Sequence, residues 1–415
     1  MLWSDAANRT NLQYLTELTM MRDDIPAGFR FSAIASGIKK SGKLDMGLIT
    51  SDLPANCAGV FTRNKVIAAP LLLTKPRVAE GKCQAILVNS GNANACTGDA
   101  GLQTAETTLQ SLAEQLQIAD NLVAVASTGV IGESLPLEPF RSGIPKLVSS
   151  LTSTDVVTVA EAMMTTDAFA KIATAKESGQ QDYRVLGLAK GAGMIHPNMA
   201  TMLGFVLTDA QVSPELLKTA LPAAVEKSFN SITVDGDTST NDMVLLLANG
   251  AAKSALIKPG TAEAEKFTRH LQRVLLDLAK MIVRDGEGAT KLVQIRVVGA
   301  KNGESARTAA RSVATSALVK TAFFGEDANW GRIIAAVGYS GIDVDPDRID
   351  ISFDQVPVAV NGLAVGVEQE AKATKVLQQD EFVVTINLHS GDGESSYYTS
   401  DLSYEYVKIN ADYRT

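Results

Sequence analysis

Short apolar runs, some of them alternating with polar residues, recur along the first half of the chain and again near its end. Runs of this length and pattern are typical of β-strands. In the first half they predict strands over residues 29–35, 47–50, 84–89, 122–127 and 202–208. Towards the C-terminus the clearest strand patterns cover residues 356–360 and 382–386.

Other segments repeat apolar residues every three or four positions, which is the period of an amphipathic helix. The longest covers residues 262–284, where Leu271, Leu275, Leu278 and Ile282 form one apolar stripe and charged residues occupy the other faces. Helices are predicted in the same way over residues 102–116, 214–228, 306–320 and 330–337. Strands and helices do not alternate as in a doubly wound nucleotide-binding fold, so we expect an α+β fold, a layered α/β sandwich.

The composition is that of a globular protein with a sizeable core. The chain has 415 residues, of which 46% are hydrophobic and 20% charged. A formal net charge of −8 makes a nucleic-acid partner unfavourable, and no apolar run is long enough to predict a membrane span. Three cysteines without a Cys-x-x-Cys pair, and three widely separated histidines, predict a cytoplasmic protein without disulfides or a metal site.

The most informative segment is residues 190–203, which read KGAGMIHPNMATML. This Gly-rich run places Thr201 directly after the small residue Ala200. A Thr hydroxyl in such a run could attack the preceding carbonyl and form an ester, which water then opens. The new N-terminal Thr201 would combine a hydroxyl nucleophile with its own α-amine, a base of unperturbed pKa about 7.7–8.0. An ordinary loop that leads into a strand explains the same residues equally well.

Polar residues elsewhere permit both a functional and an ordinary interpretation. Thr128 and Gly129 end a strand-like run and suit an oxyanion hole, or simply a strand-to-loop turn. Lys190 suits a substrate carboxylate and Glu287 an ammonium group, but lysine and glutamate most often occupy solvated surface positions. The acidic segment 235–242 resembles the start of a calcium loop, yet a leucine stands where that loop requires a glutamate.

The segment 190–203 resembles the processing site of ornithine acetyltransferases, also called bifunctional glutamate N-acetyltransferases, of arginine biosynthesis. The resemblance runs from residue 21 to the C-terminus and includes STGVIG at 127–132, MTTD at 164–167, DGEGATK at 285–291 and residues 410–415. It implies a DmpA/ornithine-acetyltransferase-like fold that cleaves itself into two chains. The N-terminal fragment would be 21–200 and the C-terminal fragment 201–415, with a C-terminal subdomain from about residue 300; residues 1–20 would be an extension.

The same resemblance assigns roles to particular residues. It implies cleavage between Ala200 and Thr201, with Thr201 as the nucleophile and Thr128 and Gly129 as the oxyanion hole. The substrate contacts that it implies are Thr165 or Thr166, Lys190, Thr201, Glu287, Asn410 and Thr415. Independently of the resemblance, Thr165 and Thr166 could cap the start of a helix.

The activity that the resemblance implies is a ping-pong acetyl transfer. The acetyl group of N2-acetylornithine would pass to Thr201 and then to L-glutamate, giving ornithine and N-acetylglutamate. No metal or organic cofactor is expected, acetyl-CoA is an additional acetyl donor to test, and the fragments are expected to form a heterotetramer of two α and two β chains. Two other functions would fit the same machinery: an N-terminal-nucleophile aminopeptidase or amidase, which would pass the acyl group to water, and a self-processed binding protein.

Overall fold

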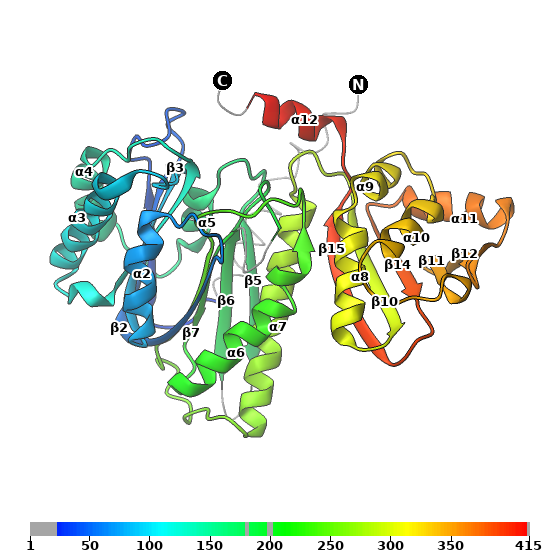
Figure 1. The fold of residues 1–415 in the computed structure, drawn as a ribbon. Helices are drawn as coiled ribbons and strands as arrows, with labels where there is room; N and C mark the ends of the chain where they lie inside the picture. The colour runs from blue at the N-terminus through cyan, green and yellow to red at the C-terminus, as the bar shows by residue number, and fades with distance from the viewer. Residues whose placement is uncertain (1–22, 179–181, 197–201, 413–415) are drawn as a thin grey trace.

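Two mixed β-sheets, each covered by helices, organise the chain (Figure 1). The computed structural model describes residues 23–178, 182–196 and 202–412. Within these ranges the larger sheet has eight strands: β1 (Phe29–Ile34), β2 (Met46–Phe61), β3 (Lys82–Asn92), β4 (Val123–Val130), β5 (Lys171–Glu177), β6 (Tyr183–Lys190), β7 (Leu203–Thr208) and β9 (Met243–Ala248). Their order is β4-β3-β2-β9-β7-β6-β5, with β1 paired to β2.

The smaller sheet is built mainly from the C-terminal third of the chain. Its described strands are β8 (Ile232–Thr233), β10 (Leu292–Ala300), β11 (Asp350–Phe353), β12 (Val356–Val360), β13 (Leu363–Ala364), β14 (Glu381–Asn387) and β15 (Gly393–Ser400), in the order β13-β12-β11-β14-β10-β15-β8. The short strand β8 pairs with β15 in parallel and brings a segment from the middle of the chain into this sheet. The α+β layered sandwich predicted from the sequence is confirmed.

Helices cover both faces of the larger sheet. On one face lie α6 (Pro214–Glu226) and α7 (Ala262–Arg284), and on the other α2 (Ala69–Ala79) and α5 (Val156–Met163), while α3 (Gly98–Leu116) and α4 (Glu138–Ser149) pack near β2, β3 and β4. The smaller sheet carries α8 (Gly303–Thr315), α9 (Ala317–Phe324), α10 (Trp330–Gly338) and α11 (Val367–Leu377), and α12 (Tyr404–Ala411) crosses the top of the molecule (Figure 1). Short 3-10 turns cover Asp120–Leu122, Phe229–Ser231 and Pro346–Arg348.

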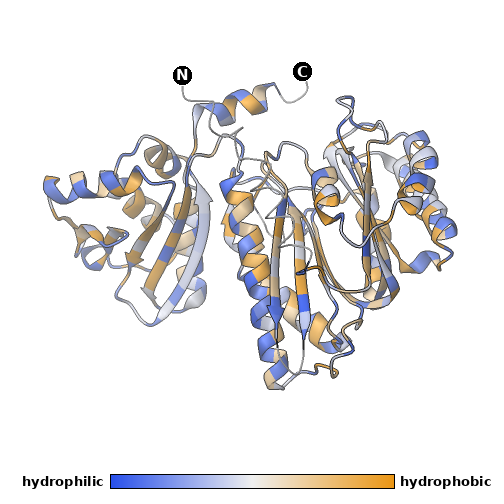
Figure 2. Ribbon diagram, turned by 180° about the vertical axis from the view of Figure 1, so that it is seen from behind, coloured by the Kyte–Doolittle hydropathy of each residue, from blue (hydrophilic) through white to orange (hydrophobic). Residues whose placement is uncertain are grey.

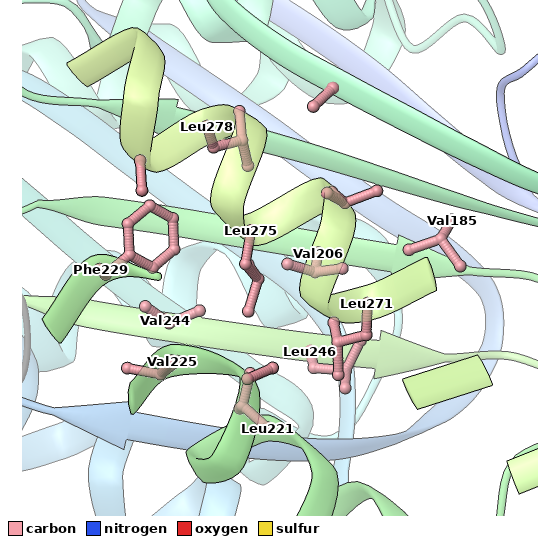
Figure 3. Close-up of a cluster of buried hydrophobic side chains, with 14 of the residues drawn as sticks. Val185, Val206, Leu221, Val225, Phe229, Val244, Leu246, Leu271, Leu275 and Leu278 are labelled. Atoms are coloured by element: carbon pink, nitrogen blue, oxygen red, sulfur yellow. The ribbon is translucent and has the colours of Figure 1, made fainter. Parts of the chain in front are cut away.

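Helix α7 has the bounds predicted from its apolar stripe. Leu271, Leu275, Leu278 and Ile282 are fully buried against the larger sheet. Figure 3 shows the first three of these side chains pointing toward valines and leucines of β6, β7 and β9 and toward α6. In Figure 2 hydrophobic residues concentrate on the strands and on the helix faces that meet them. The burial of this stripe fixes α7, whose C-terminal end leads into the candidate site.

Two elements differ from the sequence prediction. The predicted helix over residues 306–320 is two helices, because the backbone turns at Ser316 and its hydroxyl accepts a hydrogen bond from the Val319 N–H as the N-cap of α9. Strand β2 is much longer than the predicted segment 47–50, since it continues past a register shift between Thr50 and Ala55. Among the helices of the described ranges, none has both the length and the apolar character needed to cross a bilayer.

Candidate active site

A cavity of about 260 Å³ opens at the edge of the larger sheet where β4 and β6 end and β7 and β9 begin. Parallel pairing of β7 with β9 and antiparallel pairing of β6 with β7 bring Lys190, Leu203 and Met243 to this edge. The cavity is lined by Ala93, Thr128, Gly129, Val130, Ile131, Thr165, Thr166, Lys190, Gly193, Met194, Met202, Leu203, Ser239, Asn241, Asp242, Glu287 and Asn410.

Thr128 and Gly129 line the cavity at the end of β4. The parallel register with β3 places Gly129 directly beside Gly91. A Cβ atom on Gly129 would lie only 2.3 Å from the carbonyl carbon of Gly91, and Gly129 has a φ of +134°. Both observations require glycine at this position. Thr128 and Gly129 therefore lie at the cavity wall, where hydrogen-bond donors of an oxyanion hole would have to be.

Lys190 is the last residue of β6 and is only 8% exposed, so it is not a solvated surface lysine. Burial lowers its pKa below the usual value, while the neighbouring carboxyl groups of Asp167, Asp242 and Glu287 favour its charged form. The cation therefore lies in an enclosed site among acidic groups. A substrate carboxylate that enters the cavity would be attracted by a charge that water screens weakly.

A buried ion-pair network supports this part of the site. The Lys171 Nζ atom contacts the carboxylates of Asp167, at 2.8 Å, and Asp285. Burial opposes the ionisation of Asp167, but Lys190 and Lys171 hold the pKa of its carboxyl well below the usual value. The N–H of Gly191 donates to Asp167 over 2.6 Å, and that of Ala168 donates to Asp285 over 3.0 Å. The network thus joins the end of β6, the segment after α5 and the end of α7.

Glu287 lies two residues beyond Asp285 and is 9% exposed, not a solvated turn acid. Its N–H donates to the carbonyl of Ala192 over 2.9 Å, and its carboxylate accepts a hydrogen bond of 2.8 Å from the amide of Asn410 on α12. A Cβ on Gly193 would lie 2.4 Å from the Glu287 carboxylate, so glycine makes room for the acid. The carboxylate faces the cavity and has further oxygen lone pairs with which to accept from a ligand.

Thr165 and Thr166 both line the cavity. They do not cap the start of a helix, because α5 ends at Met163 and the chain is extended at Met164. The N–H of Thr165 instead donates to the Asp167 carboxylate over 2.9 Å. The two hydroxyl residues therefore belong to the same wall of the cavity as the ion-pair network.

The structure brings most of the predicted residues into one cavity. The seven that line it are Thr128, Gly129, Thr165, Thr166, Lys190, Glu287 and Asn410. The predicted cleavage pair, Ala200 and Thr201, and the predicted contact Thr415 lie outside the described residues. Met202, the covalent neighbour of Thr201, lines the cavity.

Sequence reasoning missed several residues of the site. Asn241 donates from its side-chain amide to the carbonyls of Ala93, at 2.6 Å, and Ser127, at 2.9 Å, and so joins the end of β4 to the start of β9. Asp242 is buried beside it. The signal that could have found them is the polar run 235–242 directly before the apolar strand β9, which the sequence pattern relates only to a calcium loop.

The cavity combines a buried cation, buried carboxyl groups and an accessible strand end within an α+β sandwich. This combination is that of an enzyme acting on a small molecule that carries both charges. The family model for ArgJ matches residues 30–415, and the chain belongs to the ArgJ family. The resemblance to ornithine acetyltransferases that the sequence motifs indicated is therefore confirmed.

Individual relatives are similar along nearly their whole length. The arginine biosynthesis bifunctional proteins ArgJ of Syntrophotalea carbinolica and Geobacter sulfurreducens are 63% identical over 388 residues and 55% identical over 389 residues. Each comparison covers 94% of this chain and 99% of the relative. A crystal structure of ArgJ from Bacillus halodurans is 44% identical, covering 50% of this chain and 98% of that chain with a TM-score of 0.49. The ornithine acetyltransferase of Mycobacterium tuberculosis, solved with ornithine, is 38% identical, covering 42% and 94% of the two chains with a TM-score of 0.38.

Proposed function

We propose that this chain transfers the acetyl group of N2-acetylornithine to L-glutamate in arginine biosynthesis, through an acetyl ester on Thr201. The observation that carries the proposal is the convergence of Lys190, Glu287 and the Thr128–Gly129 strand end on one cavity beside Met202, in a member of the ArgJ family. Relatives at 63% and 55% identity are named as bifunctional proteins of arginine biosynthesis.

The reaction begins with cleavage of the Ala200–Thr201 bond, which frees the α-amine of Thr201. This amine takes the proton of the Thr201 hydroxyl, and the oxygen attacks the acetyl carbonyl. Donors at Thr128 and Gly129 stabilise the resulting oxyanion, and one such donor is typically worth about 2.7–4 kcal/mol. The bond between the acetyl carbon and the ornithine nitrogen then breaks, the amine returns the proton to that nitrogen, and acetyl-Thr201 remains.

The second half of the reaction runs in reverse on another amino acid. The neutral amino group of glutamate attacks the ester, its proton passes to the Thr201 oxygen, and N-acetylglutamate leaves. In both halves Lys190 holds the α-carboxylate that the two substrates share. Glu287 suits the side-chain ammonium of ornithine, and the hydrogen bond that it accepts from the Asn410 amide holds its carboxylate in place.

The decisive experiment follows both the chain and the acetyl group. Mass spectrometry of the purified protein should find a fragment that begins at Thr201 and becomes acetylated there with acetylornithine alone. Glutamate should then remove the label as N-acetylglutamate. The Thr201→Ala variant should stay uncut and inactive, whereas Thr154→Ala, which changes an exposed threonine outside the cavity, should behave as the wild type.

Two results would contradict the proposal. Release of acetate in place of N-acetylglutamate would favour an aminopeptidase or amidase. An uncut Thr201→Ala variant that retains full transfer activity would exclude Thr201 as the nucleophile.

We also propose a cytosolic heterotetramer of two α and two β fragments, which native mass spectrometry of the purified protein would test. Neither half-reaction needs a metal or an organic cofactor, so activity should survive dialysis against a chelator. Acetyl-CoA is an additional acetyl donor to test, because the relatives are named bifunctional. Transfer of label from acetyl-CoA to glutamate would show that second activity.

A further inference from the structure

Asn241 precedes β9 by two residues, lines the cavity and is only 5% exposed. Its side-chain nitrogen donates to the carbonyl of Ala93 over 2.6 Å and to that of Ser127 over 2.9 Å. Carbonyl oxygens can only accept, so this end of the side chain must be the NH2 group and both of its hydrogens are committed. The amide oxygen accepts from the Thr240 hydroxyl over 2.6 Å. Although Asn241 lines the cavity, its side chain therefore has no hydrogen left to donate to a ligand.

The two carbonyls that Asn241 binds control the segment 127–130, which contains the proposed oxyanion hole. The carbonyl of Ser127 belongs to a planar peptide unit, so fixing its oxygen also fixes the direction of the next residue's N–H group. At the other end of the segment, the Ala93 N–H donates to the carbonyl of Val130 over 2.9 Å. One amide side chain therefore holds both ends of the segment, the first directly and the second through Ala93.

The segment needs such an anchor because a glycine stands inside it. Gly129 has a φ of +134°, and a Cβ atom there would lie 2.3 Å from the carbonyl carbon of Gly91. No side chain can pack at this position to fix the backbone, and glycine has the greatest conformational freedom. Oxyanion donors are effective only when they already point, from about 2.7–3.1 Å, at the place where the charge develops. Hydrogen bonds from a buried amide supply the rigidity that glycine lacks.

Asn241 also links this segment to the strands that follow the proposed nucleophile. Two residues after it, Met243 begins β9 and pairs in parallel with Leu203 at the start of β7. Leu203 follows Thr201 by two residues in the sequence. Both carbonyls that Asn241 binds precede the proposed cleavage point, whereas Asn241 follows it. The amide thus fastens a strand end of one proposed fragment to the central strands of the other.

We propose that Asn241 is a positioning residue, which holds the oxyanion donors at Thr128 and Gly129 in place relative to the start of β7. The inference rests on the proposed function. Asn241 acts through two backbone carbonyls and touches none of the reacting groups itself. Its role requires an amide, because at this side-chain length only asparagine presents two donor hydrogens on one neutral nitrogen.

The test uses the full chain with two substitutions of this amide and one matched control. Asn241→Asp keeps the shape of the side chain but places an acceptor oxygen against two carbonyl oxygens, which it repels. Asn241→Ala removes the group and leaves a space, continuous with the cavity, that water can fill. The control is Asn56→Asp, because Asn56 pairs with Ala248 at the opposite end of β9, does not line the cavity, and donates from its amide to the carbonyl of Val212 over 2.8 Å.

Four properties are measured for each protein. They are the melting temperature, kcat for acetyl transfer, the single-turnover rate at which acetyl-Thr201 forms, and the dissociation constant of ornithine by calorimetry. Where a variant is not cut, both fragments are co-expressed as separate chains, so that removal of an initiator methionine exposes Thr201.

The expected results separate positioning from a general loss of structure. Asn241→Asp should reduce kcat and the acetylation rate about 10²-fold, the effect of displacing catalytic groups by about 1 Å. Asn241→Ala should reduce both rates by a smaller factor, because water can bond to the two carbonyls without pushing the strand end away. Ornithine should bind both variants as it binds the wild type, since Lys190 and Glu287, which would hold it, lie on other elements. Asn56→Asp should retain the wild-type rates.

Wild-type rates in Asn241→Asp would overturn the inference while leaving the proposed function intact. A loss of ornithine binding in parallel with kcat, or an equal fall of kcat in Asn56→Asp, would also overturn it. If Asn241→Asp does not fold, the rates of Asn241→Ala decide in the same way. Wild-type protein that forms no acetyl-Thr201 would instead contradict the proposed function, whatever the variants do.

Discussion

Replacing Lys171 with methionine should destabilise the protein strongly, because it removes the cation that contacts both carboxylates of a buried ion-pair network. Lys171 Nζ and both carboxylates it contacts are almost completely inaccessible, with side-chain exposures of 0% for Lys171, 0% for Asp167 and 4% for Asp285. Methionine fills a similar volume but leaves two acids in a region of low dielectric. Removing one partner of a buried pair typically costs about 3–5 kcal/mol of unfolding free energy.

The assay is chemical denaturation of Lys171→Met beside Lys176→Met, which lies on the same strand. Lys176 pairs with Asp24 over 3.2 Å, but its side chain is 60% exposed, so its loss should cost at most about 1 kcal/mol. A second change, Asp285→Asn, should recover part of the stability of Lys171→Met by removing one stranded charge. Equal losses in the two lysine variants would refute the argument that burial makes this network important.

Three further predictions concern two residues of the cavity and Lys320 of α9. Gly129→Ala should reduce acetyl transfer about 10²-fold or more by displacing the strand end. Gly338→Ala, at the end of α10, should not, because an added Cβ there meets nothing within 4 Å; steady-state kinetics compares the two variants. Glu287→Gln should raise KM for acetylornithine about tenfold or more through loss of a charged hydrogen bond, and an unchanged KM would argue against ammonium recognition there. Burial lowers the pKa of Lys320 to about 7, although Asp401 and Asp235 favour its charged form. In the unfolded chain a lysine has a pKa of about 10.4, so between about pH 7 and 10.4 the unfolded state binds more protons than the folded state. Unfolding free energy should rise over that window in the wild type and rise less in Lys320→Met, as thermal melts at several pH values would show.

The sequence pattern predicted those helices and strands whose apolar residues repeat regularly over several turns or positions. The α7 stripe repeats over six turns, so its bounds, Ala262–Arg284, could be read from the chain, and β1 was equally clear. The prediction of one helix over residues 306–320 was wrong, because apolar spacing continues across Ser316. Only the N-cap hydrogen bond in the structure reveals the break. Strands β5, β6, β10 and β15 were not predicted, since their burial depends on neighbours distant in the chain.

For the site as well, the sequence motifs identified candidate residues but not their burial, which depends on contacts between distant parts of the chain. Thr128, Gly129, Lys190 and Glu287 were selected from motifs, but local sequence favoured a solvated position for the lysine and the acid. Their burial results from contacts over long sequence separations, such as the bond between Asn410 and Glu287, which are 123 residues apart. Asp242 could not be recognised, because nothing in the sequence shows that this carboxyl is buried in the cavity wall.

The pairing of β6 with β7 has a consequence for the cleavage that we propose. These two strands are antiparallel partners in register from Val185 with Thr208 to Lys190 with Leu203. The proposed cleavage would leave these backbone hydrogen bonds intact, because it breaks no bond within either strand. Neither half holds a complete set of cavity residues, since Thr128 and Lys190 precede the cut and Glu287 and Asn410 follow it. Each of the two proposed fragments would therefore need the other to complete the site, and the pairing of β6 with β7 would hold them together.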